Sequence, residues 1–242
     1  MELIVFDLVG YFAHFRRFYS TTSSLSYAFP PRTTISGIIA AILGMERDSY
    51  YGIFSTERAR IAVRLMTPVR RITQTLNYLH TKKEGNLFLK YWGMHEPAQI
   101  PTEILATEDL SPLRYRIYFN HDELNEGLRE KLESGKAHYP VYLGTAFNPG
   151  YVDYVGLREA SITRGGEEIE IGTVIPRSAV EEIIPKNGLR IYLEERVPAD
   201  FFEDRRIRRV EDYVYEGRGM PIPVRLSAPY FSIDGDVNGV FL

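Results

Sequence analysis

The stretch Tyr27-Ala-Phe-Pro-Pro-Arg-Thr-Thr-Ile-Ser-Gly-Ile-Ile-Ala-Ala-Ile-Leu-Gly44 decides the start of the fold. Its two consecutive prolines prevent a helix before them, and either Thr33 or Thr34 is placed to cap a helix that begins there. Apolar residues then recur with helical spacing, which predicts an amphipathic helix over about 33–43 that ends at Gly44. The first N–H groups of such a helix favour an anion, most simply a phosphate.

Strands are predicted on both sides of this helix. Residues 2–8 are apolar on one face and nearly so on the other, as expected near the centre of a sheet, and residues 59–66 alternate between polar and apolar. An extended hairpin follows, with arms at 72–80 and 87–92 and a polar turn at 81–86. Because both faces of this hairpin are polar, we expect it to reach away from the core.

The order of elements predicts an α+β fold. A strand over 113–119 and a helix from Asp122 to Gly135 continue the chain, giving the beginning of a βαββαβ ferredoxin-like unit, the fold of RNA recognition motifs. The fourth strand has no clear place in the Gly-, Pro- and Tyr-rich segment 139–156. We expect a ferredoxin-like domain over 1–160, with the β-hairpin inserted near 70–95, and a smaller antiparallel β region over 161–242. Its strands are expected at 189–197, 209–215, 223–226 and 230–233.

Composition sets the class of protein. The chain has 242 residues, of which 44% are hydrophobic and 25% charged, enough for a sizeable core. It has no cysteine, which excludes disulfides and a thiolate nucleophile. No apolar run is long enough to span a membrane, and Met1 leads directly into the first strand instead of a signal peptide. We therefore expect a cytoplasmic protein without a membrane partner.

Charge is distributed unevenly along the chain. Residues 1–100 carry 12 Lys and Arg against 7 Asp and Glu, whereas residues 101–242 carry 17 against 25, although the net charge of the whole is only -3. A basic first half can bind a polyanion while the acidic remainder faces basic protein neighbours or solvent. Chance variation is the alternative explanation.

Known catalytic and metal-binding motifs are missing from the sequence. The five histidines have no metal-ligand spacing, and neither a nucleophile elbow nor a glycine-rich nucleotide loop occurs. We therefore expect no metal and no cofactor.

Aromatic and cationic residues alternate between Tyr11 and Tyr19 and return at Tyr27, Phe29 and Arg32. Single-stranded nucleic acid favours this composition, because bases stack on rings while arginines neutralise phosphates. Among the rings, Phe12, Phe15 and Phe29 are expected in the core. For the arginines, exposed and solvated side chains are the alternative.

Two segments resemble a known family. The block Tyr27 to Gly44, with the strand and aromatic-basic run before it, and the later Tyr139-Pro-Val-Tyr-Leu-Gly144 resemble the fifth CRISPR-associated (Cas) protein family, RAMP-superfamily subunits of type I Cascade complexes. The resemblance implies a ferredoxin-like domain with a β-hairpin thumb. It also implies binding of the CRISPR RNA 5′ handle and capping of the backbone filament, beside the seventh-family Cas backbone subunit and the large subunit.

Under this first hypothesis, phosphates are bound by arginines and by the helix start, bases stack on tyrosines, and the hairpin clamps the RNA. The residues assigned to these roles are Arg16, Arg17, Tyr19, Tyr27, Arg32, Thr33, Thr34, Ser36, Arg70, Arg71, Lys82 and Lys83. The alternative for the hairpin is a solvated edge that its lysines protect against aggregation.

A second hypothesis is metal-independent cleavage of precursor CRISPR RNA. One branch of the family performs it with a tyrosine and an adjacent lysine and histidine, but this chain has no Lys-His dipeptide. The approximate counterparts are Tyr50 or Tyr51, Lys82 or Lys136, and His80 or His138. A third hypothesis is an interaction module whose basic half binds an acidic protein.

Overall fold

The computed structural model describes residues 1–20, 23–79, 97–235 and 237–242. Its elements, in chain order, are β1 (Glu2–Gly10), β2 (Phe15–Arg16), β3 (Ser26–Tyr27), α1 (Arg32–Leu43), β4 (Arg60–Leu65), β5 (Arg70–Leu79), β6 (Pro97–Ala106), β7 (Leu113–Asn120), α2 (Asn125–Glu133), β8 (Tyr151–Glu159), β9 (Ser161–Thr163), β10 (Glu168–Ile171), β11 (Ile175–Pro176), the 3-10 turn η2 (Arg177–Ala179), β12 (Val180–Ile183), β13 (Ile191–Phe201), β14 (Ile207–Glu216), β15 (Ile222–Leu226), β16 (Tyr230–Ile233) and β17 (Val237–Gly239).

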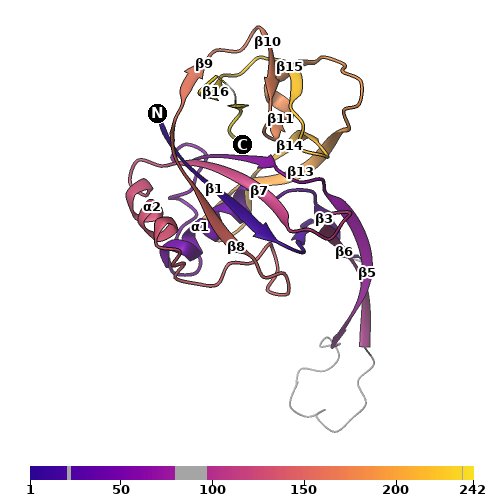
Figure 1. Ribbon diagram of the computed structural model, residues 1–242. Coiled ribbons are helices and arrows are strands. Elements are labelled where there is room, and N and C mark those ends of the chain that lie inside the picture. Colours follow the sequence, from indigo (N-terminus) through magenta and orange to yellow (C-terminus); the bar gives the residue numbers. More distant parts are fainter. Residues whose placement is uncertain (21–22, 80–96, 236) are drawn as a thin grey trace.

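The largest sheet has the strand order β4-β7-β1-β8, and every neighbouring pair is antiparallel (Figure 1). Because side chains alternate along a strand, Ile4, Phe6 and Leu8 of β1 face one side and join the core that contains α1 and α2. Leu3 and Val5 face the other side and pack against Phe231 and Ile233 of β16. Helices thus cover one face of the sheet, and C-terminal strands cover part of the other. This combination confirms the predicted α+β class.

Helix α1 matches its predicted range, but its cap differs. Pro31 occupies the N-cap and no side chain caps the helix, so the predicted Thr33 or Thr34 cap is wrong. Instead, the Thr33 hydroxyl points to the Pro198 carbonyl, 3.4 Å away. The other end is as predicted, because Gly44 adopts the left-handed conformation with φ 79°.

Strands β5 and β6 form a long two-stranded ribbon that leaves the body (Figure 1). Their pairing runs continuously from Arg70 opposite Ala106 to Leu79 opposite Pro97. The predicted second arm at 87–92 lies outside the described residues. In the structure β5 pairs with β6, at 97–106. The sequence did not predict β6, because its residues show no clear strand pattern.

The last third of the chain forms three small sheets, with strand orders β10-β15-β12, β11-β14-β13 and β17-β16-β9. The four predicted strands correspond to β13, β14, β15 and β16. Val197, Tyr213 and Tyr215 belong to the same core as α1 and β1, so this region packs directly on the main sheet. In the part of the chain that the structure describes, no helix is long and apolar enough to cross a membrane.

Candidate nucleic-acid interface

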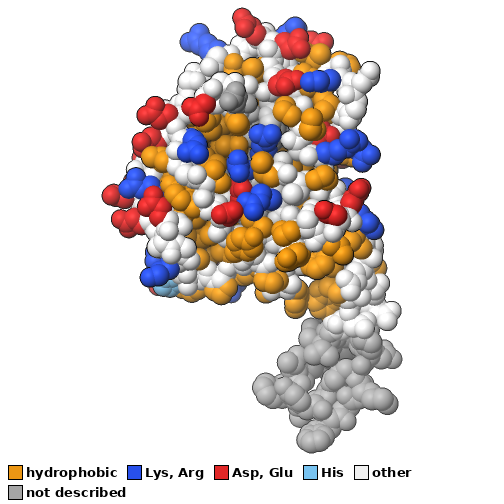
Figure 2. All heavy atoms as spheres, in the orientation of Figure 1, with side chains coloured by type: hydrophobic (Ala, Val, Ile, Leu, Met, Phe, Trp, Pro, Cys, Tyr) orange, Lys and Arg blue, Asp and Glu red, His pale blue; other side chains and the backbone are white. Residues whose placement is uncertain are grey.

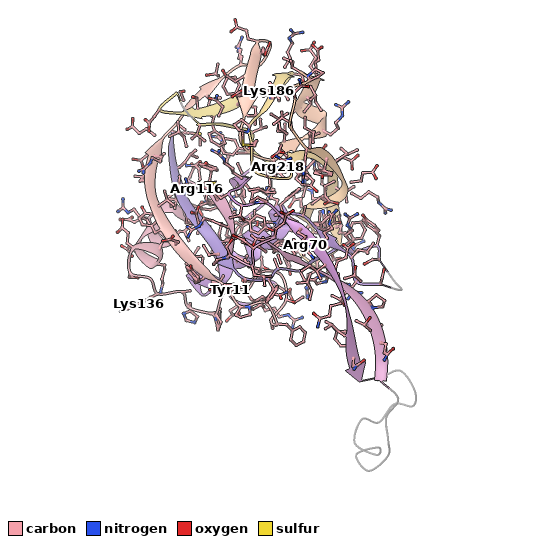
Figure 3. The ribbon with its side chains drawn as sticks, turned by 45° about the vertical axis from the view of Figure 1, so that its right-hand side comes forward. Tyr11, Arg70, Arg116, Lys136, Lys186 and Arg218 are labelled. Carbon is pink, nitrogen blue, oxygen red and sulfur yellow. The ribbon has the colours of Figure 1, made fainter. Side chains whose placement is uncertain are left out.

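A groove of about 430 Å³ lies at the root of the β5–β6 ribbon. Three segments meet there: the turn after β1, the two ribbon strands, and the loop before β8. Its walls consist of Phe12, His14, Gln74, Leu76, Asn77, Tyr78, Thr102, Ile104, Thr145, Phe147 and Asn148. Figure 3 shows Tyr11 and Arg70 on the body close to where the ribbon departs. The groove is therefore built where a projecting arm meets the body.

Gly144 allows the loop before β8 to reach this position. Its φ is 92°, and a Cβ there would lie only 2.0 Å from the His14 carbonyl oxygen. The His14 N–H donates to the Leu143 carbonyl at 3.0 Å, and the Asn148 carbonyl accepts from the Leu143 N–H at 2.8 Å. Only glycine fits such a close backbone approach, which fixes the loop, including Phe147, against the groove.

His14 is held within the wall by two hydrogen bonds. Its Nδ1 lies 2.6 Å from the Glu103 carbonyl and its Nε2 lies 2.9 Å from the Ser24 hydroxyl. Burial lowers the pKa of His14, which favours the neutral ring that donates from Nδ1 and accepts at Nε2. His14 thereby joins β6 to the segment before β3, and its role is to position the ribbon.

The groove exposes rings beside uncharged hydrogen-bonding groups. Phe147 is 75% exposed and Phe12 44% exposed, so Phe12 is not the core residue that was expected, whereas Phe15 and Phe29 are buried as predicted. Tyr78 of the wall is 40% exposed, and further exposed rings lie outside the wall: Tyr11, Tyr139, Tyr142 and Tyr151. Figure 2 shows hydrophobic side chains gathered over the lower part of the body, beside the ribbon. Exposed rings next to amide and hydroxyl groups suit unpaired bases.

Of the predicted RNA-binding arginines, Arg16, Arg70 and Arg71 are exposed, but Arg71 is paired with Glu194. The other two, Arg16 and Arg70, form no ion pair within the described residues. By strand alternation, Arg70 lies on the same face of β5 as Gln74 and Tyr78 in the groove wall. Arg16 lies on β2, one residue beyond the buried Phe15. Both can supply charge close to the groove.

Arg32 does not contact the surface, which corrects its predicted role. Its side chain is 1% exposed and donates to the carbonyls of Phe54, Ala199, Ser55 and Ala59 at 2.7–3.2 Å. Burial lowers the pKa of Arg32 to about 10. Arg32 therefore binds the protein's own backbone, and the start of α1 is closed to a phosphate.

Tyr27 and Ser36 are also buried, against the prediction. The Tyr27 hydroxyl donates to the Arg196 carbonyl at 2.7 Å, and the Ser36 hydroxyl donates to the Arg32 carbonyl at 3.0 Å. Tyr19 is half-buried, with the Arg196 guanidinium 4.9 Å from its ring centre. Thr33 and Thr34 are also half-buried. Tyr27 cannot stack on a base, because no part of its ring is accessible.

Arg17 and Arg71 converge on one buried carboxylate, Glu194 of β13. Arg71 lies 2.8 Å from it, Arg17 contacts its other oxygen, and the Ala28 N–H donates to it at 3.1 Å. Desolvation raises the pKa of Glu194 although both arginines oppose this shift. These two arginines hold the ribbon and the N-terminal segment to the C-terminal region. Predicted residues Lys82, Lys83 and His80 lie outside the described residues.

The candidate catalytic residues are separated along α1. The Tyr50 hydroxyl lies over Gly37, whereas the His138 ring lies over Gly44, about 10 Å further along the helix. The Tyr51 hydroxyl donates to Asp48. Within residues 1–20, 23–79, 97–235 and 237–242, no group of three or more His, Asp or Glu side chains could hold a metal ion. The described geometry does not bring tyrosine and histidine within the hydrogen-bond reach that RNA cleavage needs.

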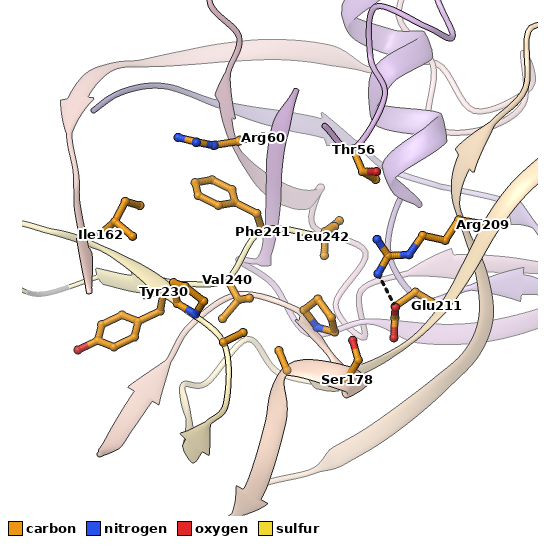
Figure 4. Close-up of a pocket in the computed structure, with 14 residues that line it drawn as sticks. Thr56, Arg60, Ile162, Ser178, Arg209, Glu211, Tyr230, Val240, Phe241 and Leu242 are labelled. Carbon is orange, nitrogen blue, oxygen red and sulfur yellow. Dashed lines mark hydrogen bonds and ion pairs between the residues drawn. The ribbon is translucent and has the colours of Figure 1, made fainter. Parts of the chain in front are cut away.

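A second hollow, of about 450 Å³, lies between β4 and the C-terminal strands (Figure 4). Its lining is mainly apolar and includes Ile162, Val240 and Phe241. Arg209 in its wall is already paired with Glu211 at 2.9 Å. Arg60 also lines this hollow, but none of its described lining residues is an amide side chain such as Gln74 and Asn148 of the groove.

The sequence did not single out Gln74, Phe147 and Asn148 of the groove. The concentration of Gly, Pro and aromatic residues over 139–156 could have indicated a functional loop in this segment.

Comparisons with known proteins place the chain in a family. A family model described as CRISPR-associated protein (Cas_Cas5) matches residues 3–209. No curated protein matches. The fold is similar to a crystal structure of a CRISPR protein from Archaeoglobus fulgidus, with TM-score 0.59 and 14% identity over 98% of this chain and 97% of that one.

Two further structures have a similar fold. One is a chain of a CRISPR RNA-guided surveillance complex, with TM-score 0.52 and 13% identity over 91% of each chain. The other belongs to a Type III-B Cmr-beta complex bound to cognate target RNA and AMPPnP, with TM-score 0.50 and 11% identity over 93% of this chain and 86% of that one. Since the family model spans most of its length, this chain belongs to the CRISPR-associated Cas_Cas5 family.

Proposed function

We propose that this protein is a CRISPR RNA-binding subunit of a type I Cascade complex, holding the 5′ handle in the ribbon-root groove and capping the backbone filament. The observation that carries the proposal is the exposed ring of Phe147 beside the amides of Gln74 and Asn77 in a chain of this family. Its partners would be the seventh-family Cas backbone subunit and the large subunit. We propose a cytoplasmic location as well, since the proposed RNA partner is found there.

The topology supports a finer description of the fold. In a ferredoxin-like unit the first and third strands lie at the centre of the sheet, and the strand order β4-β7-β1-β8 with helices after β1 and β7 has this form. We assign residues 1–160 to this RAMP domain and residues 161–242 to the smaller β region. The β5–β6 ribbon is then the thumb.

The proposed grip combines two kinds of contact. Exposed rings stack on splayed bases, while amides and hydroxyls of the groove read base edges. Arg16 and Arg70 neutralise adjacent phosphates, and this part of the binding weakens as salt rises. Because the wall of the groove is uncharged, base contacts and phosphate contacts can be altered separately.

Phe147→Ala tests the groove. If a handle base stacks on this ring, affinity for a CRISPR RNA carrying the handle falls about 10-fold or more, since stacking contributes about 1–3 kcal/mol per base. The measurement is a titration of labelled RNA by fluorescence anisotropy. Phe202→Ala is the matched control, because Phe202 is 47% exposed and lies outside the groove wall. Equal affinities for the two variants would refute the handle site.

The alternative, endoribonuclease activity, is tested by incubating the protein with the same RNA in the presence of a chelator and separating the products on a denaturing gel. Intact RNA is expected, because Tyr50 and His138 lie apart. Specific cleavage that is lost in His138→Ala would replace a purely binding role.

A further inference from the structure

The sheet face opposite the helices carries a second cationic cluster. Its upper half is covered by β16, but the half toward the groove displays Arg64, Arg114 and Arg116 with two aspartates, Asp7 and Asp153. Figure 2 shows blue side chains gathered on this face of the body, and Figure 3 labels Arg116 on it. Three arginines against two aspartates leave an excess positive charge there.

The two aspartates are paired with two of the arginines, Arg114 and Arg116. Buried Asp7 accepts from Arg116 Nε at 2.8 Å and from Arg114 Nη1 at 2.7 Å, and Arg114 also donates to Asp153 at 2.8 Å. These bidentate and shared contacts hold both guanidinium groups in fixed orientations.

Arg64 has no carboxylate partner in the described part of the chain, and its side chain hydrogen-bonds instead to the neutral Tyr118 hydroxyl. It lies directly opposite Arg116 in the pairing of β4 with β7, on the same face. Within the described residues Arg64 forms no ion pair, and its Nε is buried without a hydrogen-bond partner. Like charges directly opposite on neighbouring strands are unfavourable, and an anion between them removes the cost.

The Arg64 guanidinium is also confined by its surroundings. A Cβ at Gly172 would lie 3.3 Å from Arg64 Cζ, so the backbone before β11 passes close to the guanidinium. Arg218 lies exposed in the turn next to Gly219, which packs so closely on β4 that a Cβ there would lie 2.2 Å from the Leu65 carbonyl. A cation that is oriented before the ligand arrives binds an anion more tightly.

We propose that Arg64 and Arg116 bind a phosphate of the same RNA strand that the groove holds, after it leaves the groove across the open sheet face. This proposal rests on the function proposed above. Two chain segments connect the sites: Val9 to Phe12, and Asn148 to Asp153. Five extended residues span at most about 18 Å, a distance that a short stretch of single-stranded RNA covers. Tyr151, 54% exposed and paired with Val9, lies between the two sites as a stacking surface.

The test compares Arg64→Gln with Arg60→Gln, which removes the same charge from the same strand and face but lies beyond the open half. Arg64 is the residue to change, because altering Arg114 or Arg116 strands the buried Asp7 and risks misfolding. Each variant is titrated with an RNA of about 4 nucleotides, which fills only the groove, and with one of about 12.

For the longer RNA, Arg64→Gln is expected to lower affinity about tenfold and to reduce the slope of log affinity against log salt by about 0.7. The short RNA and Arg60→Gln are expected to show no change. Equal binding of the long RNA by both variants overturns the proposal even if Phe147→Ala supports the groove. If Arg64→Gln loses affinity for the long RNA while Phe147→Ala binds RNA normally, the sheet site is supported and the groove is rejected. Inorganic phosphate is also added as a competitor. If it lowers the affinity of the parent protein for the short and the long RNA by the same factor, the site binds free anions, and the proposed RNA path is overturned.

Discussion

The start of α1 and the ribbon-root groove look alike in sequence, since each combines aromatic residues with polar or cationic ones, but they differ completely in the structure. At the start of α1, Arg32 and Tyr27 are buried, and the two terminal nitrogens of Arg32 and the Tyr27 hydroxyl donate to the protein's own carbonyls. At the groove, Phe147 and Phe12 face solvent. The residue pattern predicts polar recognition in both places, and burial decides whether these side chains bind the protein itself or remain accessible to a ligand.

Changing Arg32 gives the largest expected effect. Arg32→Leu leaves four buried carbonyls without a donor, and we expect it to lower the free energy of unfolding by at least about 3 kcal/mol. Urea unfolding monitored by circular dichroism measures it. If the variant keeps normal stability but loses affinity for RNA, the structural role of Arg32 is contradicted and its predicted role in RNA binding is supported.

The neighbouring residues Arg16 and Arg17 allow an exposed arginine to be compared with a paired one. Arg16→Gln is expected to reduce RNA affinity about five- to tenfold while unfolding free energy stays within about 0.5 kcal/mol, because the side chain is exposed. Arg17→Gln serves as the contrast. It removes a partner of buried Glu194 and should lower stability by about 2 kcal/mol. If both variants behaved alike, the division between internal and external arginines would be wrong here.

The smallest expected effect is a dependence of stability on pH that arises from Glu194. Its pKa is raised above the ordinary 4.5 by desolvation, so the folded state binds this proton more tightly than the unfolded state. Its contribution is therefore fully present below pH 4.5 and is lost as pH rises through the folded-state pKa.

Relative to Glu194→Gln, which cannot ionise, the parent protein should lose stability as pH rises through this window and then level off. Thermal unfolding of both proteins in a series of buffers measures the difference. A parent protein that gains stability relative to the variant would mean that the two arginine ion pairs outweigh desolvation.

The sequence predicts the fold best where apolar residues recur with a clear helical or strand periodicity. The spacing in 35–43 and Gly44 located α1, and alternation located β1, β4 and β7. Strand β8 escaped because its segment is rich in Gly and Tyr and its pairing with β1 contains a bulge at Val5/Phe6. The division of domains at residue 160 stays a prediction.

The site was harder to predict than the fold. Arg32 donates to Ala199, a residue distant in sequence, and no local pattern shows such a partner. Phe12 and Phe15 are similar in sequence context, but only Phe15 points into the core. Contacts between distant segments decide which side chains remain for a ligand.

The convergence of Arg17 and Arg71 on Glu194 has a consequence for how the protein is made. Both arginines are synthesised more than a hundred residues before their shared carboxylate. While the chain is still emerging from the ribosome, the ribbon has no charged anchor on the body, since the N-terminal parts of a chain emerge first. The charged anchor of the ribbon therefore forms only when the C-terminal strands have been made, after all residues of the groove wall are already present.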